Sequence, residues 1–204
     1  MERAKGKRRD DRRLGLEDLA EALGLPSAHD APDVELRELE IGSGDGRILI
    51  ELARAQPLVQ FLGLEVARQP FRAAIAAARG TPNCRFLQVD ATEYLNRPTS
   101  ARYRCIHIYF PTPIAYPATG ATRYFTGQFF DRLLQLLAPG GEIRVISDRH
   151  DLANAAMRFA QARRCLLVPW TPLPLRPPEG YYIGSAWERR VDGIDRPIAL
   201  RIVP

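Results

Sequence analysis

Apolar residues follow two different periods along the chain, and these periods predict the elements of the fold. Short runs that are apolar throughout or at every second position predict strands over residues 34–41, 59–65, 85–89, 103–110 and 142–146. Apolar residues at helical spacing predict helices over residues 47–55, 67–79, 125–137 and 152–163. Strands and helices that alternate in this way build a parallel sheet with helices on both faces, so we expect an α/β fold.

The C-terminal part of the chain departs from this alternation. Residues 168–180 contain five prolines and predict an irregular segment. Two further strands are expected over 182–191 and 197–203, separated by the turn Asp192-Gly193. Because a tight turn joins them, these two strands must be antiparallel. We therefore expect a mostly parallel seven-stranded sheet that ends in an antiparallel hairpin.

The N-terminal segment is set apart by its charge. The first 13 residues hold seven cations and three acids, a net charge of +4 out of +5 for the whole chain, and both lysines of the chain are among them. Leucines at helical spacing follow over 14–25. We expect a basic tail with a short helix over 1–33 and a single domain over 34–204. Such a tail either binds nucleic acid through its phosphates or only solubilises the protein, and both interpretations stay open.

Composition excludes several other classes of protein. No apolar run approaches the roughly 18 residues needed to span a bilayer, and no signal-peptide core is present, so we expect a cytoplasmic protein without membrane contact. The three cysteines are scattered and form no CxxC pair, which argues against a disulfide framework or a metal site. His107 lies in the middle of a predicted strand and is expected in the core.

A glycine-rich segment, residues 40–46, connects the first predicted strand to the following helix. Its glycines are Gly42, Gly44 and Gly46, and a dinucleotide-binding motif would require another glycine where Arg47 stands. S-adenosylmethionine has no pyrophosphate and does not need that motif. We therefore expect the three glycines to bind S-adenosylmethionine at the turn between strand and helix.

Acidic residues stand at the ends of three successive predicted strands. Glu40 is placed to meet the cationic amine of this cofactor, Glu65 its ribose hydroxyls, and Asp90 with the adjoining Ala91 its adenine. Any one of them alone is equally typical of an ordinary polar strand end. Together they lie at the carboxyl edge of the sheet, where open α/β sheets bind ligands. The expected fold class is therefore a Rossmann-like class I methyltransferase dependent on S-adenosylmethionine.

Several sequence blocks resemble the tRNA (guanine-N7)-methyltransferase family over about residues 38–203. The matching blocks are LEIGSGDG (39–46), FLQVDATEYL (86–95), IHIYFPTP (106–113), LAPGGEIRVISD (137–148) and SAWE (185–188). The resemblance implies S-adenosylmethionine as cofactor, bound by Glu40, Glu65 and Asp90, and tRNA as partner. It also implies substrate contacts from Asp148 and from Ser185 and Glu188, which stand where the family has a T-x-x-E motif that contacts the guanine.

One loop departs from the family pattern. Where the family reads F-P-D-P-W, residues 110–114 read F-P-T-P-I, so the family's catalytic aspartate falls on Thr112. The family's lysine falls on Tyr116, and only Arg123 remains of its basic run. Guanine N7 carries a lone pair and no proton, so methyl transfer to it needs no general base. Thr112 is therefore our candidate catalytic residue and Tyr116 a candidate substrate contact.

Three functions stay open at this stage. The first is methyl transfer to guanine N7 of tRNA, with the RNA held by the basic tail. The second is methyl transfer to a small heterocyclic molecule, which the aromatic segment 112–125, with Arg123 as its single charged residue, favours. The third is a catalytically silent protein that binds S-adenosylmethionine.

Overall fold

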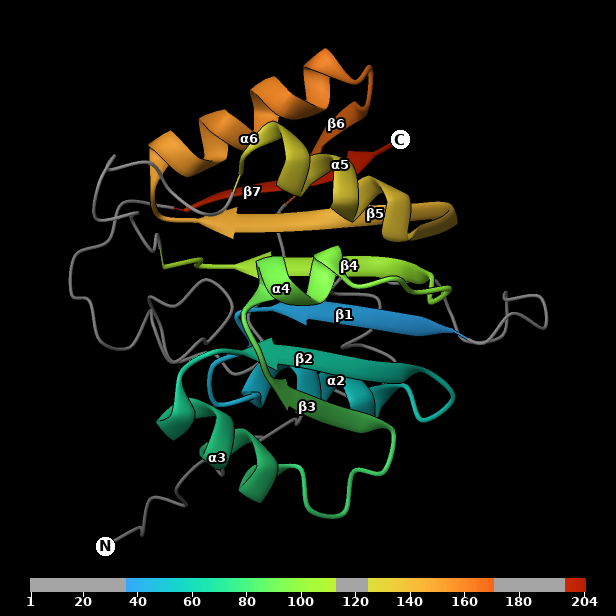
Figure 1. The fold of residues 1–204 in the computed structure, drawn as a ribbon, viewed down its shortest axis with the longest axis vertical. Coiled ribbons are helices and arrows are strands. Elements are labelled where there is room, and N and C mark those ends of the chain that lie inside the picture. Colours follow the sequence, from blue (N-terminus) through green and yellow to red (C-terminus); the bar gives the residue numbers. More distant parts are fainter. Residues whose placement is uncertain (1–35, 113–124, 171–196) are drawn as a thin grey trace, which may run out of the picture.

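The computed structural model describes residues 36–112, 125–170 and 197–204. Their strands form one seven-stranded sheet in the order β3-β2-β1-β4-β5-β7-β6 (Figure 1). Strands β1 to β5 pair in parallel, whereas β7 is antiparallel to both β5 and β6. This confirms the predicted mostly parallel sheet with an antiparallel pair at its C-terminal end.

The observed elements agree with the predicted order. The strands are β1 (Arg37–Ile41), β2 (Gln60–Glu65), β3 (Cys84–Gln88), β4 (Tyr103–Tyr109), β5 (Leu137–Ser147), β6 (Leu166–Pro169) and β7 (Ile198–Val203). The helices are α2 (Arg47–Ala55), α3 (Arg68–Ala77), α4 (Ala91–Asn96), α5 (Gly127–Leu136) and α6 (His150–Ala162). Helix α4 and strand β6 were not predicted, and β5 begins five residues earlier than expected because Leu137 already pairs with Tyr103 before a register shift.

The antiparallel pair differs from the predicted hairpin. The observed partner of β7 is β6, which ends at Pro169. The first two residues of the segment 168–180, which was expected to be irregular, therefore belong to a strand. Helix α6 and β6 are joined by residues 163–165, where Arg164 has a φ of 59° and the chain turns back toward the sheet. The predicted strand 182–191 with its turn, the basic tail and the helix 14–25 all lie outside the described residues.

Helices cover the two faces of the sheet in separate groups, as Figure 1 shows with α4 and α5 in front of the strands and α2 behind them. Alternate side chains of a strand point to opposite faces. On the α4, α5 and α6 face, the buried strand residues are apolar, among them Leu39, Ile41, Ile106, Ile108, Ile143 and Val145. On the other face, α2 and α3 pack over a second apolar cluster that includes Leu49, Leu52, Phe61, Ala74 and Phe86.

The face that α2 and α3 share also carries buried polar side chains. Glu38 and Glu40 of β1, His107 of β4 and Glu65 of β2 are all at most 8% exposed. Glu40 and Glu65 lie at the carboxyl end of their strands, next to the start of α2. None of the helices within the described ranges is both long and apolar enough to cross a membrane.

Candidate functional site

The glycine loop between β1 and α2 forms one wall of the site. Gly42, Gly44 and Gly46 have φ values of 75°, 56° and 73°, the left-handed region that other residues adopt only at a cost. The amides of Gly42 and Ser43 donate to the carbonyl of Leu64 at 2.9 and 3.0 Å, which joins the loop to the end of β2. The GxGxG spacing therefore follows from the conformation of this turn.

Gly46 has a different role from the other two glycines. A Cβ at this position would lie 2.5 Å from Cζ of Phe86 and 2.9 Å from Cβ of Ala74. At Gly42 and Gly44 no atom lies within 4 Å of such a Cβ. Gly46 thus allows α2 to begin close against β3 and α3, and it is absent from the wall of the cavity described next.

A cavity of about 450 Å³ opens at the glycine loop, at the carboxyl edge of the sheet. Its lining includes five residues that the sequence analysis assigned to the site: Glu40, Gly42, Gly44, Glu65 and Thr112. The lining residues that were not foreseen are Ser43, Asp45, Arg47, Ile48, Gln69, Pro70, Ala73, Tyr109 and Phe110. Ser43 and Asp45 are the variable positions of the glycine motif, which could have been read from the sequence, whereas the α3 residues reach the cavity only through packing.

The Glu65 carboxylate links the cavity to the backbone around it. Its Oε2 accepts from the amide of Gly44 at 2.9 Å, and its Oε1 accepts from the amide of Ala67 at 2.7 Å. An ionised carboxylate has about four acceptor positions, so both oxygens can accept a further hydrogen bond. Glu65 is therefore held in place and can still accept from two ligand hydroxyls.

Glu40 lies deeper in the same cavity. Among the described residues, its Oε2 and the Oγ of Ser43 are buried without a hydrogen-bond partner. Burial, together with repulsion from Asp45 and Glu65, raises the pKa of Glu40 well above its ordinary value. A buried polar atom without a partner costs free energy, so this floor of the cavity favours a ligand that brings a positive charge and hydrogen-bond donors.

A smaller hollow of about 110 Å³ adjoins the cavity and shares Gly42, Glu65, Phe110 and Thr112 with it. Its other walls are the apolar or partly apolar side chains of Ile41, Val66, Ile108 and Pro111. Phe110 has a φ of 47°, an uncommon value for a residue with a bulky side chain, and its amide donates to the carbonyl of Ile146 at 2.8 Å. Strained backbone of this kind clusters at functional sites.

The remaining predicted site residues do not line this cavity. Asp90 caps the N-terminus of α4, where its Oδ1 accepts from the amides of Thr92 and Glu93 at 2.8 and 3.4 Å. Ala91 is buried at the start of that helix, and Asp148 is half-buried after β5. Tyr116, Ser185 and Glu188 lie outside the described residues.

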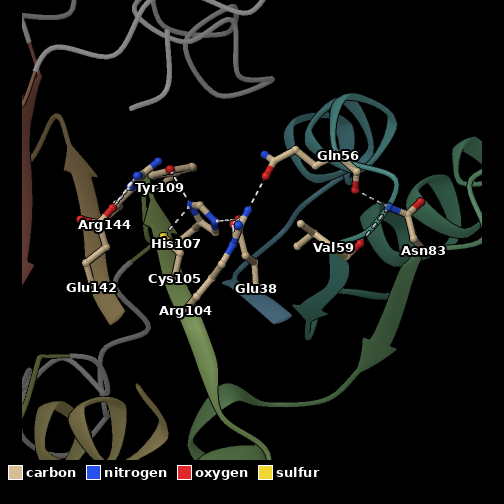
Figure 2. Close-up of polar contacts among 10 residues, drawn as sticks. All are labelled: Glu38, Gln56, Val59, Asn83, Arg104, Cys105, His107, Tyr109, Glu142 and Arg144. Atoms are coloured by element: carbon tan, nitrogen blue, oxygen red, sulfur yellow. Dashed lines mark hydrogen bonds and ion pairs between the residues drawn. The ribbon is translucent and has the colours of Figure 1, made fainter. Parts of the chain in front are cut away.

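Beside the cavity, a buried polar network centres on Glu38 (Figure 2). Its Oε2 lies 2.7 Å from Nε2 of His107, and its Oε1 accepts from Nε of Arg104 at 2.7 Å. Nδ1 of His107 lies 2.7 Å from the hydroxyl of Tyr109, whose ring lines the cavity. Burial raises the pKa of Glu38, but His107, Arg104 and Arg144 outweigh it, so that this pKa lies below its ordinary value.

The network continues across the sheet to β7. Arg144 forms an ion pair with Glu142, and Nε of Arg201 donates to Oε2 of Glu142 at 2.7 Å. The guanidinium of Arg144 also lies 5.1 Å from the ring centroid of Trp170. Buried charges are retained where they are paired in this way.

The network also brings together three side chains of metal-ligating type. Ligand atoms of Glu38, Cys105 and His107 lie within 4.8 Å of one another. Both oxygens of Glu38 and both nitrogens of His107 already have protein partners, and two guanidinium groups flank the cluster. The geometry is explained by ion pairs and hydrogen bonds within the sheet.

The sheet topology and the acidic cavity at a glycine loop define a class I methyltransferase, and the cofactor of this class is S-adenosylmethionine. The cavity suits a ligand with a cationic amine and ribose hydroxyls, because Glu40 offers a buried carboxyl oxygen without a partner among the described residues and both oxygens of Glu65 can accept further hydrogen bonds. Residues 35–171 match the model of a family described as "Putative methyltransferase". The match covers more than half of the chain, so the chain belongs to this methyltransferase family.

Curated relatives and a solved structure agree with this assignment. A protein of Halorhodospira halophila named tRNA (guanine-N(7)-)-methyltransferase is 33% identical over 157 residues, 76% of this chain and 68% of that protein. A protein of the same name from Hydrogenovibrio crunogenus is 30% identical over 74% of this chain, but the chain covers only 62% of it. SMU.1697c, a putative methyltransferase of Streptococcus mutans in complex with SAH, shares the fold with a TM-score of 0.56 at 12% identity, over 84% of this chain and 89% of that one.

Proposed function

We propose that this protein transfers the methyl group of S-adenosylmethionine to N7 of a guanine in tRNA. The observation that carries the proposal is a cofactor cavity whose lining includes Thr112, at the position of the family's aspartate, in a chain similar to proteins named tRNA (guanine-N(7)-)-methyltransferase. The proposal places the protein in the cytoplasm together with the tRNA.

The cofactor-binding roles are assigned to residues of the cavity and its neighbourhood. Glu40 holds the ammonium group, and Glu65 accepts from the ribose hydroxyls. Gly42 and Gly44 leave the space above the loop open, as the absence of any atom within 4 Å of their virtual Cβ supports. Asp90 and Ala91 are proposed for the adenine end, since α4 begins at the same edge of the sheet.

When bound, S-adenosylmethionine supplies an electrophilic methyl group, and the protein must hold the guanine in line with it. Positioning of this kind contributes a large part of the rate in displacement reactions. Guanine N7 has an available lone pair, so no side chain has to remove a proton. Thr112 can therefore act by hydrogen bonding to the base instead of by acid–base chemistry.

The substrate-binding roles are proposed for residues beyond the cavity. Asp148 follows β5 at the carboxyl edge of the sheet and can accept from the N1 and N2 donors of guanine. Ser185 and Glu188 are proposed to contact the same edge of the base, as the matching motif of the family implies. Tyr116 is proposed to contact substrate from the segment that follows Thr112.

The test is methyl transfer from labelled S-adenosylmethionine to unmodified tRNA, followed by nucleoside analysis of the digested RNA. We expect 7-methylguanosine as the labelled product. Label in free nucleobases or nucleosides with none in tRNA would replace the proposal with the small-heterocycle function. No transfer to either substrate, with cofactor binding demonstrated, would indicate a silent member of the family.

A pair of variants ties the activity to the cavity. Glu65→Gln removes the charge that accepts from two backbone amides and, in our proposal, from the ribose, and is expected to raise the Kd for the cofactor at least roughly tenfold. Glu93→Gln is the matched control, because Glu93 is exposed on α4 and, within the described ranges, its side chain pairs with Arg97 alone. Equal methylation rates for both variants at low cofactor concentration would contradict the assignment.

A further inference from the structure

Helix α3 carries a stripe of arginines on its exposed side. Arg68 and Arg72 lie four residues apart on α3, and with Ile75 their side chains leave the helix within a sector of roughly 60°. Arg79 follows in the turn just after the helix ends at Ala77. All four residues are exposed. Figure 1 shows α3 beside the edge strand β3 at this end of the sheet. We call Arg68, Arg72 and Arg79 the α3 stripe.

The charges of the α3 stripe are not neutralised within the described part of the protein. None of its three arginines forms a hydrogen bond or an ion pair with a described residue, and α3 itself contains no acidic residue. Some other surface arginines do have acidic partners, as Arg97 has in Glu93, Arg149 in Asp151 and Arg163 in Asp131. The α3 stripe is therefore a local concentration of positive charge, and such a patch attracts polyanions.

A large apolar side chain is exposed within the same surface. Ile75, between Arg72 and Arg79 along the chain, is 47% exposed. Of the residues of α3, only Ala74 is fully buried. A single exposed apolar residue is ordinary on its own. Here it lies among arginines that have no acidic partner within the described residues, so a ligand on this surface meets both positive charge and an apolar side chain.

The α3 stripe also lies next to the cofactor cavity. Gln69, Pro70 and Ala73 of the same helix line that cavity, on a different side of α3 from the stripe. A ligand bound along the stripe is thus separated from the cofactor by the width of one helix. By contrast, the segment from Thr112 to residue 122, where the family has its basic run, contains no cation.

We propose that the α3 stripe binds the phosphate backbone of the tRNA substrate, an inference that rests on the proposed function. Guanidinium groups match phosphates in geometry and charge. From Arg68 to Ala77 helix α3 rises about 14 Å, and a nucleic-acid duplex carries on the order of eight phosphates over that length. The stripe then supplies, from another element, the cationic contact that residues 112–122 lack.

The experiment measures equilibrium binding of an unmodified tRNA transcript to the full chain over a range of salt concentrations. Each phosphate contact contributes about 0.7 to 0.9 to the slope of log K against log salt. The variant Arg68→Ala/Arg72→Ala/Arg79→Ala is expected to lower this slope by about 2 to 3 and to raise the Kd at least roughly tenfold at about 0.1 M salt. Its affinity for S-adenosylmethionine should equal that of the wild type, which shows that the cavity is intact.

Two further variants make the result specific. Arg102→Ala/Arg132→Ala/Arg158→Ala removes the same number of exposed arginines from other parts of the surface and should leave slope and Kd unchanged. Arg68→Lys/Arg72→Lys/Arg79→Lys keeps the charge and should restore most of the slope. An equal loss in the control variant would overturn the proposal, because net charge alone would then account for binding.

Failure of this inference can be distinguished from failure of the proposed function. Formation of 7-methylguanosine with a slope that does not change in the α3 variant would overturn the inference and leave the function standing. A slope that depends on the stripe, without any methylated guanosine, would support the inference and overturn the function. If the wild-type chain binds no tRNA, and acidic proteins bind the stripe instead, the inference is wrong.

Discussion

Glu40 shows how a single residue sets the chemistry of the cavity. The residue is 3% exposed, has acidic neighbours in Asp45 and Glu65, and leaves one oxygen without a partner among the described residues. Its carboxyl group therefore holds its proton to a higher pH than an ordinary glutamate. A ligand cation relieves the repulsion and favours the carboxylate, so binding of the cofactor and loss of this proton are coupled.

This coupling predicts how cofactor affinity changes with pH. Below the raised pKa of Glu40, binding must release a proton, so the affinity for S-adenosylmethionine should rise with pH, by up to about tenfold per unit. Glu40→Gln should bind S-adenosylmethionine more weakly, and its affinity should no longer rise with pH because of this carboxyl group. The amine of the ligand titrates in the same way with both proteins, so the difference between the two affinity curves reports Glu40 alone. Calorimetric titration between about pH 5 and pH 8 measures both curves. Parallel curves for the two proteins would refute the assignment.

Two other residues stand where the sequence predicts ligand binding, but each also has a structural role in the fold. Asp90 stands at a strand end, as a cofactor contact does, but it is also the N-cap of α4, with Glu93 three residues later as in a capping box. Gly46 belongs to the glycine motif but provides space for Phe86 and Ala74. In both cases the residue type suits two tasks, and only the neighbours across space distinguish them.

Among the secondary-structure elements, β1 places two buried glutamates on one face of the sheet, and their pKa values are shifted in opposite directions. Glu38 and Glu40 are two residues apart and almost equally buried, with exposed fractions of 0% and 3%. The pKa of Glu38 is lowered because His107, Arg104 and Arg144 overcome the effect of burial, whereas Glu40 has burial and two acids raising its pKa. The neighbouring strand β4 supplies the difference, since two of these basic groups belong to it.

The lowered pKa of Glu38 predicts a loss of stability in acid. Its folded pKa lies below the unfolded value near 4.5, so its contribution is fully present above that value and disappears as the pH falls through the folded pKa. Glu40 contributes in the opposite sense: its raised pKa favours folding below the unfolded value, and this contribution is lost as the pH rises through the folded pKa.

Variants of Glu38 test this assignment by urea unfolding as a function of pH. Glu38→Gln is expected to cost about 3–5 kcal/mol at neutral pH, because it leaves the partly buried Arg104 and the buried His107 without their anion. The difference from the wild type should shrink below about pH 4. Glu93→Gln removes an exposed carboxylate and should cost less than about 1 kcal/mol. A constant difference at every pH would show that packing, and not charge, explains the loss.

At the scale of the whole molecule, the cofactor cavity joins elements that are far apart in the chain. Its walls come from the glycine loop, the end of β2, helix α3 and the residues after β4. A ligand that binds there contacts all four and should stabilise the folded protein as a unit. At about 100 times the Kd, the expected stabilisation is about 2.7 kcal/mol.

This stabilisation predicts a shift in thermal unfolding. For a chain of 204 residues, it corresponds to a rise in Tm of roughly 5–10 °C on addition of S-adenosylmethionine. Glu65→Gln should reduce the shift, whereas Glu93→Gln should keep it. Differential scanning fluorimetry measures all three proteins. An equal shift in the Glu65 variant would place the ligand elsewhere on the molecule.

The distribution of charge is a second property of the whole molecule. Residues 14–204 contain 22 arginines and 21 acids, so the sequence predicts an almost neutral domain behind the basic tail. The fold pairs many of these charges, including those of the buried network, and leaves the α3 stripe without partners among the described residues. The position of the positive surface therefore depends on where the acidic residues lie in the fold, and composition alone does not predict it.

The order of strands and helices, the turn at the glycine loop and the acidic strand ends follow from the amino-acid sequence alone, because periodicity and turn chemistry depend on residues close together in the chain. Other features arise only from the packing of distant segments in the folded protein, here called tertiary structure. It selected β6 as the partner of β7, gave Glu38 and Glu40 opposite pKa shifts, assigned Asp90 to a helix cap and left one side of α3 cationic. These properties depend on contacts such as that between Glu38 and His107, 69 residues apart, which only folding creates.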